Sequence, residues 1–150
     1  MTDEDFMLLA LKEARKAAAC DEVPIGAILA DPQSGRVIAK AHNKSEFGND
    51  ATAHAEILVI RKACRKLKTK RLWGLDLYVT LEPCTMCAAA VSFARIRRLV
   101  FGAGDIKGGA VLNGVCFYEQ PTCHHRPEIV SGICKEECGQ LLKDFFKQKR

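Results

Sequence analysis

The chain has 150 residues and an ordinary globular composition, which together predict one compact domain over residues 1–150 with a single core. The uncharged stretch at residues 83–94 is too short to span a bilayer, and the acidic start at residues 1–5 lacks the basic region of a signal peptide. We therefore expect no membrane partner and a cytoplasmic location. The net charge of +5 is compatible with an RNA partner but does not require one.

The first part of the chain predicts a helix followed by a β-hairpin. Apolar residues recur at helical spacing over residues 5–19. Two β-type runs at residues 23–30 and 36–41 flank a turn at residues 31–35, an order typical of an antiparallel hairpin. A polar loop is expected at residues 45–50.

A second helix is expected to begin after Thr52, which we interpret as its N-cap. Basic side chains crowd one face and the end of this helix, and we interpret them as a solvated surface that the helix dipole favours at its C-terminus. The opposite face is predicted to form the buried stripe, which comprises Ile57, Ile60, Cys64 and Leu67.

A strand at residues 75–81, an alanine-rich helix at residues 84–94 and a strand at residues 99–103 come next. This order predicts a parallel pair of strands with a right-handed crossover. A loop with a short element near residues 115–118 follows, and apolar residues at helical spacing between 134 and 145 predict a last helix. The fold class is therefore α/β, a three-layer α/β/α sandwich with a mixed central sheet.

Two short motifs carry the chemistry. T-A-H-A-E at residues 52–56 opens the second helix, and E-P-C-T-M-C at residues 82–87 follows a strand and opens the next helix. His54, Cys84 and Cys87 supply one imidazole and two thiolates, a set that tetrahedral Zn²⁺ prefers. Three protein ligands leave the fourth position open, as in catalytic zinc sites. The helix N-termini favour thiolates because their dipoles lower the thiol pKa.

Glu56 stands two residues after His54. A carboxylate beside a zinc-bound water can take its proton and pass it on. The spacing H-x-E followed by P-C-x-x-C is typical of zinc nucleobase deaminases, in which the glutamate is the proton shuttle and not a ligand. We therefore predict that Glu56 is the catalytic residue of a hydrolytic deaminase.

Each motif alone is less specific. A C-x-x-C pair also occurs in redox dithiols and as half of a structural zinc site. Neither of these needs an H-x-E on the preceding helix, so the combination favours a catalytic centre. The eight cysteines indicate thiols or metal ligands in a reducing compartment rather than disulfides. We interpret Cys134 and Cys138 as small buried apolar side chains.

The sequence resembles the cytidine deaminase-like superfamily and, within it, the bacterial tRNA adenosine deaminases (the TadA family), over nearly the whole chain. H-A-E at residues 54–56 and P-C-T-M-C at residues 83–87 occur in many deaminases. D-I-K-G-G-A at residues 105–110 and the ending with Phe-Phe and basic residues are closer to the tRNA-specific group. The resemblance implies a Zn²⁺-dependent homodimer that converts the wobble adenosine of a tRNA anticodon stem-loop to inosine.

The resemblance also implies substrate-binding residues. Asn43 would contact the flipped nucleoside, and Asp105 and Lys107 would lie in the loop beside it. The last helix would meet the anticodon stem-loop, where an exposed aromatic offers apolar contact and cations meet phosphates. The residues expected there are Phe146, Lys147, Lys149 and Arg150.

Two other functions stay open at this point. One is a deaminase of a free base or nucleoside, such as guanine, cytosine or a deoxynucleotide. The other is a structural-zinc RNA-binding module without catalysis, in which Glu56 would be dispensable.

Overall fold

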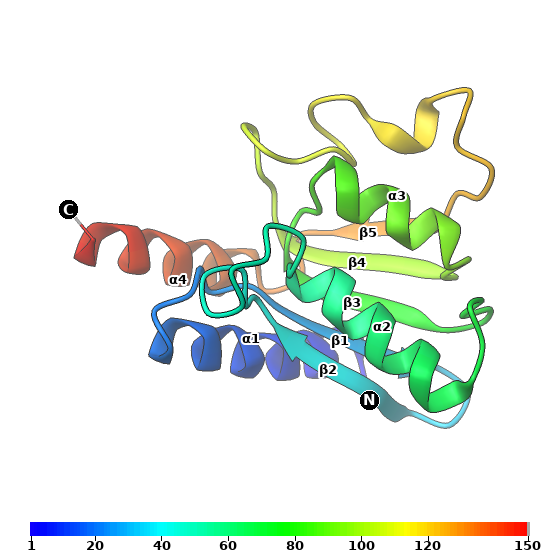
Figure 1. Ribbon diagram of the computed structural model, residues 1–150, viewed down its shortest axis with the longest axis horizontal. Helices are drawn as coiled ribbons and strands as arrows, with labels where there is room; N and C mark the ends of the chain where they lie inside the picture. Colours follow the sequence, from blue (N-terminus) through cyan, green and yellow to red (C-terminus); the bar gives the residue numbers. More distant parts are fainter. Residues whose placement is uncertain (150) are drawn as a thin grey trace.

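The computed structural model describes residues 1–149 and contains a five-stranded sheet with strand order β2-β1-β3-β4-β5 (Figure 1). In chain order the elements are α1 (Asp3–Ala19), β1 (Gly26–Asp31), β2 (Arg36–His42), α2 (Ala55–Leu67), β3 (Asp76–Leu81), α3 (Thr85–Phe93), β4 (Arg98–Ala103), the 3₁₀ turn η1 (Phe117–Glu119), β5 (Glu128–Ser131) and α4 (Lys135–Gln148).

The sheet is mixed, as predicted. β1 pairs antiparallel with β2, which confirms the hairpin, and antiparallel with β3 on its other edge. β3 and β4 are parallel and are joined through α3, which confirms the predicted crossover unit. β4 also pairs in parallel with β5.

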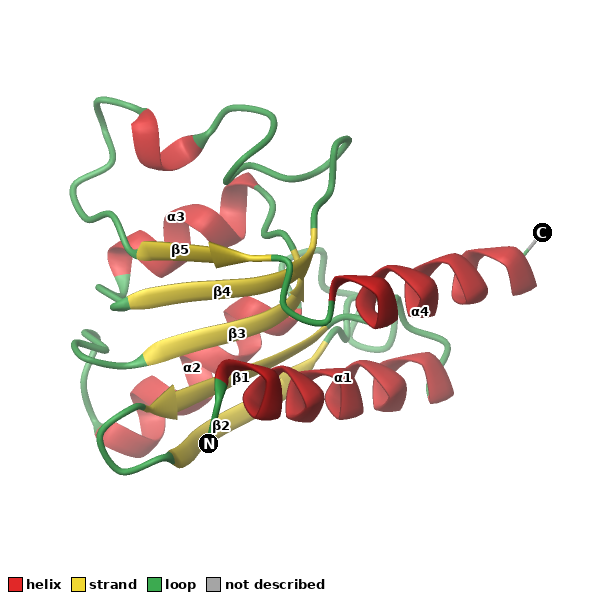
Figure 2. Cartoon of the chain, turned by 180° about the vertical axis from the view of Figure 1, so that it is seen from behind, coloured by secondary structure: helices red, strands yellow, loops and turns green. Residues whose placement is uncertain are grey.

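Helices cover both faces of the sheet. α2 and α3 pack on one face, over the core that includes Leu77 and Val79 of β3. α1 and α4 pack on the other face, over the core that includes Tyr78. The alternation along β3 sends successive side chains to opposite faces. The two views from opposite sides show these three layers (Figures 1 and 2), so the predicted α/β/α sandwich is confirmed.

α1 lies unusually close to β1 at Gly26. A Cβ atom at this position would stand 2.0 Å from the carbonyl oxygen of Ala10 and 2.5 Å from the backbone nitrogen of Ala14. Because both contacts are with helix backbone, no side-chain movement would relieve them. The glycine of the P-I-G-A run is therefore what lets the first helix lie flat on the sheet.

The N-terminus of α2 differs from the prediction. Its N-cap is His54 and not Thr52, and the His54 side chain makes no capping hydrogen bond. The hydroxyl of Thr52 donates instead to Asp50 Oδ1 at 2.7 Å, inside the preceding loop. His54 is thereby left free to turn toward another part of the chain.

The prediction for the buried face of α2 is only partly right, since Ile60 and Cys64 pack against the core but are not among the fully buried residues of the helix. Ile57, Ile60 and Cys64 are only half-buried, and Leu67 is exposed. The small side chains on the true inner face let the helix approach the sheet closely, and the larger apolar side chains pack at its margins. The residues buried on this face are Ala55, Glu56, Val59 and Ala63.

Two features near the C-terminus complete the fold. β5 was not predicted, since four residues at a sheet edge leave little periodicity. The short element near residues 115–118 is η1. Cys138 is buried, as expected, and Cys134 is half-buried. Among the described residues no helix combines the length and apolar character needed to cross a membrane.

Candidate active site

The candidate site lies at the edge of the sheet where the parallel strands β3 and β4 end. β3 stops at Leu81, and α3 begins only a few residues later. The start of α2 reaches the same edge (Figure 1). Sites in α/β sheets commonly lie outside the carboxyl ends of parallel strands. The two sequence motifs therefore meet in space although α2 and β3 separate them in the chain.

Two of the three metal-ligand candidates are N-cap residues. His54 caps α2 and Cys84 caps α3, both with extended backbone and neither with its side chain used for capping. Cys87 lies in the first turn of α3 and is buried. The Nδ1 atom of His54 lies 3.6 Å from the Sγ of Cys84 and 3.6 Å from the Sγ of Cys87. All three ligand atoms are within 4.8 Å of one another.

These distances suit a tetrahedral metal. Zinc–sulfur bonds of about 2.3 Å and zinc–nitrogen bonds of about 2.0–2.1 Å at tetrahedral angles place the N and S atoms about 3.6 Å apart. His54 Nδ1 stands at that separation from both sulfurs. The residues present can therefore hold a metal ion with one coordination position left open.

The charges of the cluster favour metal binding. A hydrogen bond from the Cys87 thiol, and a second from His54, lower the pKa of Cys84 to about 4 in spite of burial. The pKa of Cys87 is raised, because its thiol donates that bond and because it is buried. The Cys84 sulfur also raises the pKa of His54 by accepting its hydrogen bond. One thiolate is thus already present before a metal arrives.

Glu56 lies at the start of α2 with only 4% of its surface exposed. Burial raises the pKa of its carboxyl to about 7, although a hydrogen bond from its own backbone opposes the shift. A carboxyl group with a pKa near neutrality can both take up and release a proton under physiological conditions. Its position beside the ligand cluster makes it the proton-transfer group that this geometry offers.

Asn43 borders the same region. The backbone N–H of Lys44 donates to the carbonyl of Ala53 at 3.0 Å, so Asn43 lies next to the segment that carries His54. The Asn43 side chain is 5% exposed, and its Oδ1 atom is buried without a hydrogen-bond partner among the described residues. A buried unsatisfied acceptor costs about 1–3 kcal/mol. Such an atom is suited to accept a hydrogen bond from a ligand.

The sequence reasoning missed Glu82, which organises the loop after β4. Glu82 is 2% exposed, and its carboxylate accepts backbone N–H bonds from Asp105, Val111, Leu112 and Asn113 at 2.9–3.1 Å. Burial would raise its pKa, but these bonds and one from the Asn113 side chain outweigh that effect, so the pKa is lowered. The place of Glu82 directly before Pro83 and Cys84 was the only feature of the sequence that could have pointed to a role near the site.

The remaining predicted residues lie in two places. Asp105 accepts the backbone N–H groups of Lys107 and Gly108, which orders its own loop, and Lys107 is exposed. Phe146 is 47% exposed and lines a surface hollow on α4 together with Lys147. α4 itself projects past the sheet (Figure 1). Lys149 forms an ion pair with Asp21. Arg150 lies outside the described residues.

The α/β/α fold with a His-Cys-Cys cluster and an adjacent buried glutamate defines a protein of the cytidine deaminase-like class. A family model for MafB19-like deaminases matches residues 1–150, and the chain belongs to this deaminase family. A protein of this family is an enzyme, so the structural-zinc module without catalysis is not supported.

Individual known proteins are also similar to this chain. The chain is 61% identical over 145 residues to the tRNA-specific adenosine deaminase of Agrobacterium fabrum, covering 97% of this chain and 94% of that protein. A solved structure from work on A-to-I editing by tRNA:A34 deaminases is 62% identical with a TM-score of 0.89, covering 92% of this chain and 99% of the other. A guanine deaminase from Nitrosomonas europaea is 26% identical with a TM-score of 0.83, covering 95% and 83%.

Proposed function

We propose that this chain is a Zn²⁺-dependent hydrolase that converts the wobble adenosine of a tRNA anticodon to inosine. The observation that carries the proposal is the buried Glu56 beside the His54, Cys84 and Cys87 cluster. Identity of 61% to a tRNA-specific adenosine deaminase supports the substrate class. Hydrolytic deamination needs both a metal centre and a proton-transferring carboxylate, and the chain provides groups for each.

Zinc is the metal we propose. Its ligands would be His54 Nδ1 and the sulfur atoms of Cys84 and Cys87, a donor set of one imidazole and two thiolates. When bound, zinc supplies a Lewis acid that lowers the pKa of a water molecule in the open position.

Glu56 moves the protons of the reaction. Its ionised carboxylate accepts a proton from water as the water oxygen bonds to C6 of the adenine, and it delivers that proton to ring nitrogen N1. A second proton passes from the new C6 hydroxyl through Glu56 to the exocyclic amine, the C6–N bond breaks, the C6 carbonyl forms and ammonia leaves. The balance is one water consumed and one ammonia released per inosine. Burial raises the pKa of Glu56, which favours its taking up a proton and releasing it again near neutral pH.

The substrate contacts are also proposals. Asn43 Oδ1 would accept a hydrogen bond from the flipped nucleoside, which its lack of a protein partner supports. Asp105 and Lys107 would border the same nucleotide from the loop that Glu82 holds. On α4, Phe146 would offer apolar contact and basic side chains would meet phosphates of the stem-loop. These basic residues are Lys147 near the end of α4, together with Lys149 and Arg150, which follow the helix in the sequence.

The ammonium group of Lys149 is already paired with Asp21. A lysine has three N–H donors, so this ion pair leaves two for a phosphate.

The fold likeness to a guanine deaminase supports one alternative, a deaminase of a free base. The distinguishing experiment incubates the purified protein with an arginine-tRNA anticodon stem-loop carrying wobble adenosine, beside free adenosine, cytosine, cytidine and guanine. Mass spectrometry then identifies each product. Inosine in the RNA alone supports the proposal. Ammonia from a free base with unchanged RNA would replace it with the alternative.

Homodimer assembly, a cytoplasmic location and a single domain over residues 1–150 complete the proposal. The homodimer follows from the resemblance to tRNA adenosine deaminases, and the cytoplasmic location follows from the proposed tRNA substrate. Light scattering on the eluting protein measures the mass of the assembly, and a mass of one chain would contradict the dimer.

A further inference from the structure

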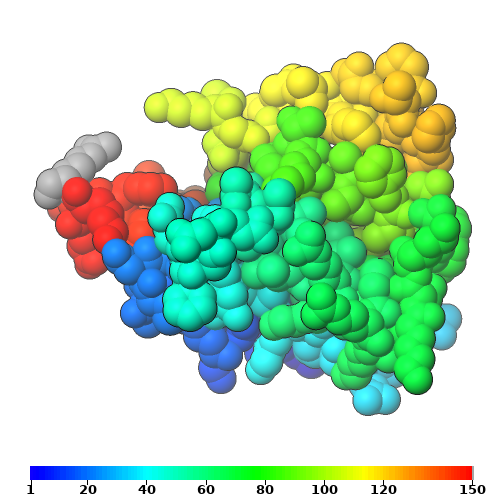
Figure 3. Space-filling model, in the orientation of Figure 1, coloured from blue at the N-terminus to red at the C-terminus, as the bar shows by residue number. Residues whose placement is uncertain are grey.

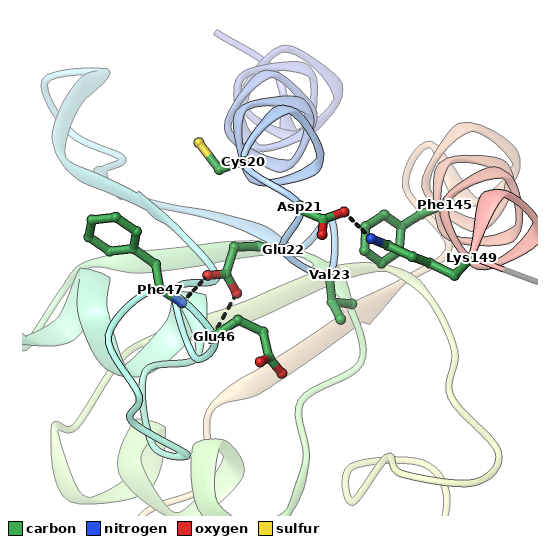
Figure 4. Close-up of a pocket in the computed structure, with 8 residues that line it drawn as sticks. All are labelled: Cys20, Asp21, Glu22, Val23, Glu46, Phe47, Phe145 and Lys149. Atoms are coloured by element: carbon green, nitrogen blue, oxygen red, sulfur yellow. Dashed lines mark hydrogen bonds and ion pairs between the residues drawn. The ribbon is translucent and has the colours of Figure 1, made fainter.

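A cavity of about 470 Å³ opens between the end of α1, the loop of residues 45–50 and the end of α4. In the space-filling view this loop (blue-green) lies at the surface between α4 and α2 (Figure 3). Phe47 and Phe145 stand on opposite sides of the cavity (Figure 4). The full lining comprises Cys20, Asp21, Glu22, Val23, Glu46, Phe47, Phe145 and Lys149.

Two segments connected to Asn43 also line the cavity. The backbone N–H of Asn43 donates to the carbonyl of Ile25 at 3.0 Å, and Val23, two residues before Ile25, lines the cavity. Phe47, four residues after Asn43, lines it as well. A polynucleotide whose target base reaches Asn43 would therefore bring a neighbouring nucleotide to this cavity.

The loop that carries Phe47 is held in place by a buried carboxylate. Glu22 is 1% exposed and accepts the backbone N–H groups of Glu46 at 3.0 Å and Phe47 at 2.6 Å (Figure 4). The N–H of Gly48 also donates to the carbonyl of Lys44 at 3.0 Å. Phe47 is nevertheless 84% exposed, so it contributes little to the core. A fixed backbone that presents an exposed aromatic ring is preorganised for stacking.

The charges of the cavity favour a base over a phosphate. Three carboxylates, those of Asp21, Glu22 and Glu46, line it against the single ammonium of Lys149. That ammonium is already paired with Asp21. A phosphate inside the cavity would meet this net negative charge, so the phosphate proposed for Lys149 would bind outside it. A neutral base can instead lay its face on an aromatic ring.

We propose that Phe47 is the stacking platform for the base of a nucleotide adjacent to the target adenosine in the RNA. This inference rests on the proposed function, because a free base or nucleoside has no neighbouring nucleotide. Phe47 is a positioning residue in this role, since it holds the strand and does not touch the reacting atoms.

The first test compares steady-state kinetics of Phe47→Ala with the wild type on the anticodon stem-loop. Loss of one base–aromatic stack predicts a KM raised roughly 5- to 150-fold with kcat unchanged. Phe47→Trp, which keeps an aromatic face, is expected to retain a KM close to that of the wild type. The melting temperature should not fall, because the side chain is exposed. Trp73→Ala is the matched control, since Trp73 is 64% exposed but precedes β3, at the end of that strand away from Cys84.

The second test removes the base instead of the ring. Stem-loops that are abasic on the 5′ or on the 3′ side of the target adenosine are assayed with both proteins. One of the two abasic stem-loops should raise the KM of the wild type by about the factor that Phe47→Ala causes on the intact stem-loop. For the Phe47→Ala protein, the same abasic stem-loop should give no further rise in KM. An unchanged KM for Phe47→Ala on the intact stem-loop would overturn the inference while leaving the proposed function intact. So would a rise in KM from Phe47→Ala that adds to the rise from the abasic site at both the 5′ and the 3′ position. A wild type that forms no inosine in RNA would overturn both.

Discussion

The carboxylate of Glu82 accepts a hydrogen bond of 2.7 Å from the side-chain amide of Asn113, which lies 31 residues further along the chain. The loop between them wraps the carboxylate so closely that a Cβ atom on Gly109 would stand 2.4 Å from Glu82 Cδ. Because Glu82 comes two residues before Cys84, one buried acid joins the candidate metal site to the loop of Asp105. This coupling makes Glu82 a sensitive position for both stability and activity.

Replacing Glu82 by Gln is expected to lower the free energy of unfolding by about 3 kcal/mol at pH 7, since an ionised acceptor of several hydrogen bonds is lost. The pKa of Glu82 is lowered in the fold. Its contribution is therefore present above the ordinary glutamate pKa of about 4.3 and is lost as the pH falls through the lower folded value. Urea unfolding at pH 7 and below pH 4 checks this. A difference between wild type and variant that does not shrink in acid would contradict it.

The Glu56→Ala variant tests the proton-transfer role. Removing a general acid–base group is expected to lower kcat by at least about 10²–10⁴-fold. Zinc content should remain near one per chain, because Glu56 is not a ligand. Elemental analysis and inosine formation are measured on the same sample, with Glu119→Ala as an exposed carboxylate control. Full activity in Glu56→Ala would exclude the mechanism.

Asn43→Ala separates binding from folding. Because Oδ1 of Asn43 has no partner among the described residues, its loss should change the melting temperature little. A hydrogen bond lost to the substrate should instead lower kcat/KM about 10- to 100-fold. Ser45→Ala removes only the long 3.5 Å contact from Asn43 Nδ2 and serves as the control. A large drop in stability without a kinetic effect would assign Asn43 a structural role.

Asp76 offers the opposite case, a residue important for stability alone. It is 1% exposed and accepts bonds from Arg97 at 2.7 and 2.9 Å and from Arg98 at 3.3 Å. Asp76→Ala leaves Arg98 without part of its charge compensation and is expected to cost about 3–5 kcal/mol. Arg97→Ala should cost less, since that side chain is 48% exposed. Asp76 begins β3, at the far end from Cys84, so kcat/KM of the folded fraction should not change.

The candidate site shows which functional residues short sequence motifs can predict and which they cannot. The spacing of His54 and Glu56, and of Cys84 and Cys87, identified residues that the structure brings within a few ångströms, because each pair belongs to one helix start. Glu22 belongs to no such motif, and the place of Glu82 before Pro83 and Cys84 does not indicate which groups its carboxylate binds. Each accepts backbone N–H groups from residues more than 20 positions away. A short sequence motif cannot indicate a hydrogen-bond partner that lies so far along the chain.

By itself the sequence determined the order of the helices and of strands β1 to β4, the β1–β2 hairpin and the β3–α3–β4 crossover. These follow from periodicity and connection length, which are local properties of the chain. Only the tertiary structure decided which face of α2 is buried, that residues 128–131 add a fifth strand, and that Glu22 holds the loop of the exposed Phe47. The physical reason is that each of these depends on close packing or hydrogen bonds between distant segments, whose free energy exists only once the chain has folded.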